Sequence, residues 1–222
     1  MLANWDRRFN LDARGAVLFR EWLTRYHYNE TYLGRELFDV PFNPAKPLTT
    51  PFGLKNPDRA LDKLAEAATL MVEAGVPLDT PLGEHQRGYR MNEIFPIHGG
   101  NRREGVANLQ VSATRYSNPT ETPIYTGSDT FVADSESLSE TGYNVVHGSS
   151  FIMTLAYTDE GPEAQAILSY SQSGNPYSDY FSDQTALYRD KMWRDILFSP
   201  QDVSRDAISV KTITSGKSAA DL

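Results

Sequence analysis

Two apolar runs that follow each other closely constrain the fold of this sequence more than any other feature. Residues 150–157 and 164–170 are rich in apolar and aromatic side chains, and they are joined across the segment Thr-Asp-Glu-Gly-Pro at 158–162. Runs of this length with so short a connection predict adjacent antiparallel strands that are buried on at least one face. Helices and hairpins occur without a regular strand-helix-strand alternation, so the sequence predicts an α+β fold with antiparallel sheet and not a doubly wound sheet.

The clearest helix is predicted at residues 57–74. Asn56 is a suitable N-cap, Pro57 takes the first helical position, and Gly75 ends the helix. Its apolar stripe is predicted to consist of Leu61, Leu64, Ala65, Ala68 and Met71.

Two more helices are indicated by weaker patterns. Apolar residues recur at helical spacing in 12–26, where Asp12 is available as the N-cap, and in 184–197, where Ser182 or Asp183 would serve. A tryptophan lies on the apolar stripe of each helix and is expected to be largely buried. These residues are Trp22 and Trp193.

The remaining segments are predicted from composition and alternation. Short strands are expected at 108–114, 143–147 and 207–214. Residues 77–105 show little periodicity and are expected to be irregular, covering a core or framing a cleft. Residues 126–142 are rich in Ser, Thr and acids and predict an exposed loop or hairpin with solvated acids.

Composition excludes several kinds of partner and chemistry. The 222 residues, 40% of them hydrophobic, suffice for a single domain or a large piece of one spanning 1–222. A formal charge of −8 without a Lys/Arg cluster argues against nucleic acid or anionic membrane as partner. Without cysteine, the chain has no thiolate nucleophile or sulfur-ligated metal. Because no phosphate-binding glycine motif is present and His27, His85 and His98 are scattered, we expect no cofactor and no metal.

Targeting signals are also missing from the sequence. No window approaches the roughly 18 apolar residues of a membrane span, and the start MLANWDRRFN lacks the apolar region of a signal peptide. We therefore expect either a protein that is not exported or an internal or C-terminal piece of a longer one.

A serine nucleophile needs a base within hydrogen-bond reach and donors for an oxyanion. Ser149 and Ser150 follow His147, and in an extended segment the side chains of His147 and Ser149 lie on one face. Ser171 and Ser173 are the other candidates, but neither pair forms a G-x-S-x-G elbow. A histidine and a serine that close a strand turn explain the His-Gly-Ser tripeptide more simply.

A calcium or general-acid site is the second chemical candidate. It would combine Asp179, Asp183 and the carbonyl-rich turn at 171–176, but the spacing matches no EF-hand loop. Helix capping explains these acids more simply. The glycines after His98 are superficially similar to the oxyanion loops of esterases, although a glycine turn that lets two backbones approach is the favoured interpretation.

Four ordered segments resemble the C-terminal part of the large subunit of penicillin acylase family enzymes. They are WDRRFNLDARGAVLFREW (5–22), FPIHGGNRREGVAN (95–108), GYNVVHGSSF (142–151) and YSQSGNPYSDYFSDQ (170–184). Within that family, the sequence of these segments is most similar to the branch of acyl-homoserine lactone acylases and aculeacin-type lipopeptide acylases. The resemblance covers nearly the whole chain and implies the C-terminal portion of an N-terminal-nucleophile hydrolase, an αββα sandwich.

The resemblance also implies where the chemistry lies. In this family a precursor cuts itself before a serine, which becomes residue one of the large subunit and uses its own α-amino group as base. Met1 is no such nucleophile, the oxyanion donors and acyl pocket lie upstream of the matched segments, and Asn175 lies in the wrong motif. We therefore expect no catalytic residue in this chain, which would supply the scaffold.

The implied partners are the small subunit and the N-terminal part of the large subunit. The implied substrate of the complete enzyme is a small acyl amide: an acyl-homoserine lactone, a lipopeptide or a β-lactam side chain. The family implies a periplasmic or secreted location. Two alternatives remain open: a non-catalytic binding module that uses the 12 tyrosines, and a free-standing serine hydrolase that uses Ser149 and His147.

Overall fold

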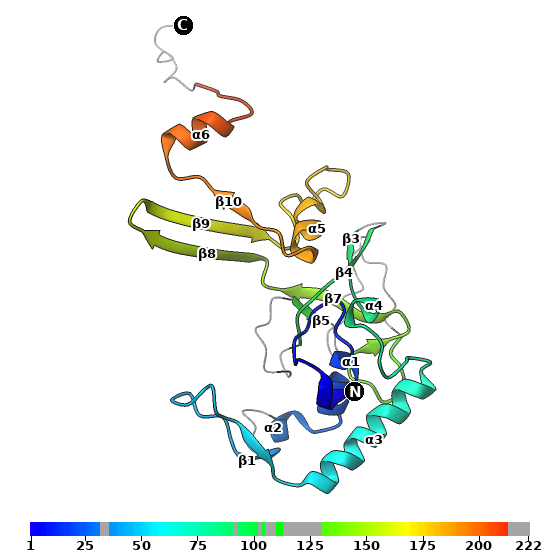
Figure 1. Cartoon of the computed structure of the whole chain (residues 1–222). Helices are drawn as coiled ribbons and strands as arrows, with labels where there is room; N and C mark the ends of the chain where they lie inside the picture. Colours follow the sequence, from blue (N-terminus) through cyan, green and yellow to red (C-terminus); the bar gives the residue numbers. More distant parts are fainter. Residues whose placement is uncertain (32–35, 91–92, 102–103, 105–109, 113–129, 213–222) are drawn as a thin grey trace, which may run out of the picture. The chain divides into compact units, whose positions relative to one another are not determined.

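The fold is α+β, with helices and largely antiparallel sheets. The computed structural model describes residues 1–31, 36–90, 93–101, 104, 110–112 and 130–212. The chain divides into two compact units (Figure 1). Unit 1 comprises Met1–Ile152 and Ile167–Met192, and unit 2 comprises Met153–Ala166 and Trp193–Leu222.

Helix α1 (Ala16–Thr24) is the centre of unit 1 and begins later than predicted. Gly15, with φ 129°, occupies the N-cap, whereas Asp12 is exposed and does not cap the helix. The chain first makes a turn in which the Ala13 amide donates to the Asn10 carbonyl at 3.1 Å, which delays the helix. A Cβ at position 15 would lie 3.2 Å from the Trp5 ring, so glycine also makes room for that packing.

Helix α3 (Pro57–Glu73) packs beside α1 and confirms the predicted helix to within a residue (Figure 1). The Asn56 side chain accepts from the Arg59 amide at 3.0 Å, and Gly75 adopts φ 71° after the last turn. The predicted stripe was partly wrong, because Leu61 is 63% exposed and Ala65 is exposed. The buried residues of α3 are Ala60, Ala67, Leu70 and Met71. The Trp22 indole donates to the Ala60 carbonyl at 2.9 Å and thereby fixes which face of α3 turns inward.

A five-stranded sheet forms the rest of the unit 1 core. Its order is β4 (Glu93–Pro96), β3 (Gln86–Arg90), β7 (Gly142–Gly148) and β5 (Gln110–Ser112), with β6 (Leu138–Ser139) also paired to β7. Strands β3 and β7 run parallel and the other pairs antiparallel. The strands predicted at 143–147 and 108–114 are present, the latter at the three residues of β5 that the structure describes.

Two segments predicted to be irregular or exposed are ordered instead. Residues 77–105 contain α4 (Leu82–His85), β3 and β4. The strands are short, and in β3 even the buried Gln86 is polar and donates to the carbonyls of Ile97 and Gly99, so no apolar alternation marks that strand. In 126–142, residues 126–129 lie outside the described part. The predicted hairpin is present, since Phe131 pairs antiparallel with Ser139, and Asp134 and Glu140 are exposed as expected. Three serines, however, are buried. These are Ser135, Ser137 and Ser139.

Unit 1 also contains several smaller elements. Strands β1 (Phe38–Val40) and β2 (Phe52–Leu54) form an antiparallel pair. The remaining ones are the 3₁₀ turn η1 (Leu2–Asn4), α2 (Tyr28–Thr31) and α5 (Asp183–Arg189).

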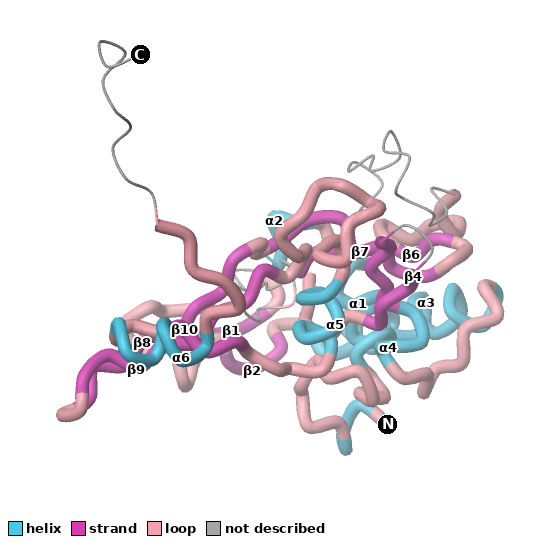
Figure 2. Tube along the Cα trace, turned by 90° about the horizontal axis from the view of Figure 1, so that it is seen from above, coloured by secondary structure: helices cyan, strands magenta, loops and turns pink. Residues whose placement is uncertain are grey.

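Unit 2 is built on a three-stranded sheet of order β10-β9-β8, in which the strands run side by side (Figure 1). Figure 2 draws these strands in magenta. Strands β8 (Phe151–Thr158) and β9 (Gly161–Leu168) confirm the predicted hairpin. They are joined by two residues and therefore run antiparallel. The prediction that this hairpin is buried on at least one face holds only for β9, where Ala164, Ala166 and Ile167 are buried. Strand β8 is exposed along almost its whole length, and the hairpin belongs to a sheet separate from that of unit 1. Helix α6 (Pro200–Asp206) follows β10 (Arg194–Ile196).

Three further predictions near the C-terminus differ from the structure. Helix α5 ends at Arg189 and not at 197, because Lys191 adopts φ 55° and the chain continues into β10. Trp193 is consequently exposed, whereas Trp22 is half-buried among the aromatic rings of unit 1. Residues 207–212 of the predicted final strand form no strand, and 213–214 lie outside the described residues.

Candidate functional site

The serines singled out from the sequence do not form a catalytic arrangement in the part of the chain that the structure describes. Ser149 is half-buried, and its carbonyl accepts from the Ser169 hydroxyl at 2.6 Å. Ser150 is exposed, and its carbonyl accepts from the Ser169 amide at 3.0 Å. The side chain of His147 lies outside the described part, so its contact with Ser149 remains a prediction.

Ser171 has a structural task that the sequence did not reveal. Its hydroxyl oxygen accepts from the amides of Gln184 at 2.9 Å and Thr185 at 3.2 Å, at the first turn of α5. It therefore caps this helix from thirteen residues away. Ser182 occupies the N-cap position, as predicted, but its side chain makes no capping hydrogen bond. No local pattern signals a cap supplied at such a distance.

The neighbouring polar residues of the 170–184 segment shape a turn. The Ser173 hydroxyl accepts from the Asn175 amide at 3.1 Å, and the Asn175 side chain accepts from the Tyr177 amide at 3.1 Å. Such bonds from side chains to nearby amides are typical of tight turns. Asp179 and Asp183 are both exposed. Among the described residues, no three His, Asp or Glu side chains converge as they would around a metal ion.

His98 and the glycines after it lie in a crossing of backbones. The His98 Nε2–H donates to the Tyr188 carbonyl at 2.8 Å, and the two rings stack 4.5 Å apart. Burial lowers the pKa of His98, which favours the neutral ring. Gly99, at φ 96°, donates its amide to the Phe9 carbonyl at 2.9 Å, which confirms that the glycine turn lets two backbones approach.

The strongest constellation of ionisable groups in the described structure is a buried ion cluster that consists of Arg20, Glu21, Glu104, Ser135 and Tyr143. Arg20 and Glu104 form a two-point ion pair, with Nη2 to Oε2 at 3.1 Å and a second contact from Nε to Oε1. The side chains are 1% and 0% exposed. The Arg20 guanidinium also lies 4.4 Å from the centre of the Tyr143 ring.

Glu21 occupies the other half of the buried ion cluster. Its carboxylate accepts from the Tyr143 hydroxyl at 2.6 Å and from the Ser135 hydroxyl at 3.0 Å. Burial raises the pKa of Glu21, and the two hydroxyl donors offset part of that rise. The pKa of Tyr143 is raised well above its usual value by burial and by the Glu21 carboxylate.

The buried ion cluster joins parts of unit 1 that are distant in sequence. It connects α1 to residue 104, to the serine-rich segment and to β7. Its side chains are closed to solvent, so it acts as a structural junction and offers no access to a substrate. Sequence reasoning missed the buried ion cluster. The only local signal was the pair of charged residues Arg20 and Glu21 inside the predicted helix at 12–26.

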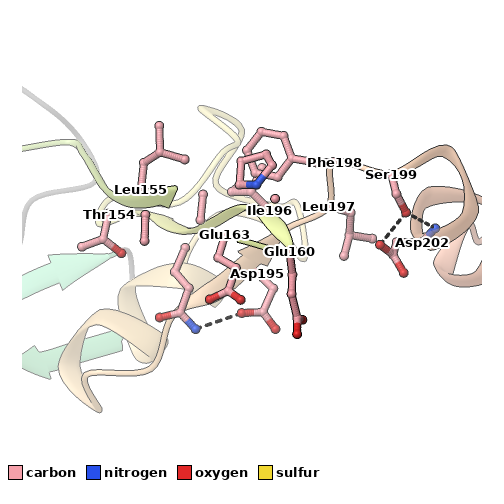
Figure 3. A pocket seen from close by; sticks show the side chains of 15 residues that line it. Thr154, Leu155, Glu160, Glu163, Asp195, Ile196, Leu197, Phe198, Ser199 and Asp202 are labelled. Atoms are coloured by element: carbon pink, nitrogen blue, oxygen red, sulfur yellow. Dashed lines mark hydrogen bonds between the residues drawn. The ribbon is translucent and has the colours of Figure 1, made fainter. Parts of the chain in front are cut away.

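A groove of about 640 Å³ lies in unit 2, between the sheet and the segment after β10 (Figure 3). Its lining includes four acids and four large apolar residues. They are Glu160, Glu163, Asp195 and Asp202, and Leu155, Ile196, Leu197 and Phe198. Ser199 accepts from the Asp202 amide at 3.0 Å as the cap of α6. No histidine lines the groove, so Ser199 has no imidazole base among its lining residues.

No helix in the described ranges is long and apolar enough to cross a membrane.

Comparison with known proteins identifies the family. The penicillin amidase model matches residues 1–205. Aculeacin-A acylase from Actinoplanes utahensis is 30% identical over 206 residues, which are 92% of this chain and 22% of the relative. The acyl-homoserine lactone acylase PvdQ from Pseudomonas syringae pv. syringae (strain B728a) is 29% identical over 220 residues, 96% of this chain and 25% of the relative.

A solved structure of thermostable penicillin G acylase from Alcaligenes faecalis aligns with 91% of this chain and 38% of its own, at 16% identity and a TM-score of 0.37. The chain spans about a quarter of the length of the curated relatives that it matches. Since the family model covers all but the last residues, the chain belongs to the penicillin amidase family.

Proposed function

We propose that this chain is part of an amidohydrolase that cleaves the amide bond between an acyl group and an amine. The observation that carries the proposal is the family match over residues 1–205, together with relatives that are named as acylases. A binding module without catalysis would not account for similarity to these enzymes along nearly the whole chain.

The chain supplies scaffold, and the nucleophile belongs to the remaining polypeptide of the enzyme. Two features support this division. The chain corresponds to about a quarter of its relatives. Ser171 and Ser173, two of its candidate nucleophiles, are engaged in capping a helix and shaping a turn. In the complete enzyme, a serine at the start of the large subunit attacks the acyl carbonyl, and its α-amine accepts the hydroxyl proton and passes it to the amine, which leaves as the amide bond breaks. Water then hydrolyses the acyl-serine ester and releases the acyl group as a carboxylic acid.

The substrate class follows from the relatives. Their names point to an acyl-homoserine lactone or to the lipopeptide aculeacin, and a β-lactam side chain is the third acyl amide within the family. The partners are the small subunit and the N-terminal part of the large subunit. We place the complete enzyme in the periplasm or outside the cell, which fractionation of the producing cells tests.

Turnover of a chromogenic acyl amide tests the proposal. The complementing polypeptide is aculeacin-A acylase without the segment that this chain matches. We expect neither this chain nor the complementing polypeptide to hydrolyse the reporter alone, and we expect hydrolysis when both are produced together. Turnover by this chain alone that is lost in Ser149→Ala would contradict the proposal and favour a free-standing serine hydrolase.

A further inference from the structure

One loop of unit 1 has its two ends joined by a side chain that is distant in sequence. The loop comprises residues 170–181, leads into α5, and belongs to unit 1 together with β3 and β4 (Figure 1). The Arg90 guanidinium, at the end of β3, donates from Nη2 to the Tyr170 carbonyl at 2.9 Å and to the Phe181 carbonyl at 2.7 Å. A single side chain therefore closes the loop.

Further contacts fix the position of this guanidinium. Its Nε also donates to the Phe181 carbonyl at 3.2 Å, and its central carbon lies 3.7 Å from the centre of the Phe181 ring. Phe181 is only 4% exposed, so it anchors this end of the loop in the protein. A planar guanidinium holds its donors in one fixed geometry, which suits the two carbonyls and the aromatic ring at once.

A second contact from the same hairpin holds the residue after the loop. Glu93, in β4, accepts from the Ser182 hydroxyl with its carboxylate. Hydrogen bonds to an ionised acceptor are stronger than those between neutral groups. This bond explains why Ser182 occupies the N-cap position without capping α5 through its side chain. We call Arg90 and Glu93 the clasp.

The remaining bonds that shape the loop come from the loop itself. The Ser173 amide donates to the Tyr180 carbonyl at 3.0 Å, across the neck of the loop. The Ser178 amide donates to the Asn175 carbonyl at 3.0 Å, and the Ser178 hydroxyl accepts from the Tyr180 amide at 3.1 Å. The clasp and these turns together supply the order of the loop within the free chain.

The loop contributes little to the core of unit 1. None of residues 171–180 is buried, and the Tyr177 and Tyr180 side chains are 87% and 63% exposed. A segment with few buried apolar contacts can open while the rest of a protein stays folded. The closed form of the loop therefore depends on the clasp and not on apolar packing.

We propose that the clasp is a conformational device that keeps the loop closed, and that its release opens residues 171–180 while the rest of unit 1 stays folded. Every contact of the clasp lies within unit 1. The inference is therefore independent of the proposed function and of the polypeptide that completes the enzyme.

Hydrogen–deuterium exchange of the full chain, measured by mass spectrometry on peptic peptides, tests the clasp. We expect Arg90→Met to speed exchange of the amides of residues 173–181 by about tenfold or more, with exchange in α3 unchanged. Arg87→Met is the matched control. It removes an arginine of the same strand whose Nη2 donates to the Glu84 carbonyl at 2.7 Å, outside the loop, and should leave exchange in the loop unchanged.

Ser182→Ala provides a milder release, because it removes only the bond to Glu93. We expect faster exchange in the loop and unchanged exchange in α3, and this variant decides the test if Arg90→Met fails to fold. Either of two results would overturn the inference: loop exchange that is no faster in Arg90→Met than in Arg87→Met, or loop exchange in Ser182→Ala that equals that of the wild-type chain.

Discussion

Replacing Glu104 by Gln should strongly destabilise unit 1, because it leaves the Arg20 guanidinium buried without its counter-charge. The substitution keeps the volume of the side chain and one of its two acceptor oxygens. Its main effect is therefore the loss of the negative charge. Arg20 and Glu104 are 1% and 0% exposed at their side chains, and water cannot replace the lost partner. Breaking a buried ion pair in this way costs about 3–5 kcal/mol of the free energy of unfolding.

In a chain of 222 residues, this loss lowers the melting temperature by roughly 6–20 °C. Urea denaturation followed by tryptophan fluorescence measures it. The matched control is Glu66→Gln, which makes the same change in the exposed pair between Lys63 and Glu66 and should cost about 0–1 kcal/mol.

A double-variant cycle separates the ion pair from other effects of the substitution. Arg20→Met combined with Glu104→Gln removes both charges, so the double variant should be more stable than the sum of the single losses predicts. Equal losses in Glu104→Gln and Glu66→Gln, or additive losses in the cycle, would refute the claim that the buried charge pair joins α1 to residue 104.

Three other predictions concern side chains whose roles the structure defines. Ser171→Ala should lower the free energy of unfolding by about 1 kcal/mol through loss of the α5 cap, and a loss no larger than that of Ser173→Ala would contradict the capping role. Because the pKa of Glu21 is raised by burial, the folded state holds that proton more tightly; stability should fall as pH rises from its ordinary value of 4.5 through the raised pKa. Glu21→Gln should remove this decline in urea titrations at several pH values, and an unchanged slope would count against it. The pKa of His98 is lowered by burial, so its contribution is present above the ordinary value of 6.5 and is lost as pH falls through the lowered pKa. His98→Phe, which keeps a ring against Tyr188, should flatten the acid limb, and an equally steep limb would argue against this assignment.

The parts of the fold that could be predicted are those specified by neighbouring residues. Asn56, Pro57 and Gly75 each act within one turn of α3, and the start and end of the helix were predicted to within a residue. The hairpin of β8 and β9 was likewise specified by its short connection. The family resemblance also depended on ordered local segments, and the penicillin amidase match confirms it. The αββα arrangement stays a prediction.

The missed features depend on contacts between distant residues. The buried serine segment is held by Glu21 through Ser135, 114 residues apart, so its polar composition alone indicated exposure. The end of α5 depends on the left-handed Lys191, for which no glycine marks the position. The buried ion cluster combines residues from α1, β7 and position 104, and no single window of sequence contains it.

Active-site labelling of the hydrolysing assembly tests most directly that this chain is scaffold and that the nucleophile lies elsewhere. The assembly of this chain with the complementing polypeptide would be inactivated with a fluorophosphonate, which reacts with activated serines, and both polypeptides would be weighed by intact-protein mass spectrometry. We predict one label on the complementing polypeptide, at the serine that begins its large-subunit part, and an unmodified mass for this chain. A stoichiometric label on this chain that disappears in Ser149→Ala together with the activity would contradict the proposed division.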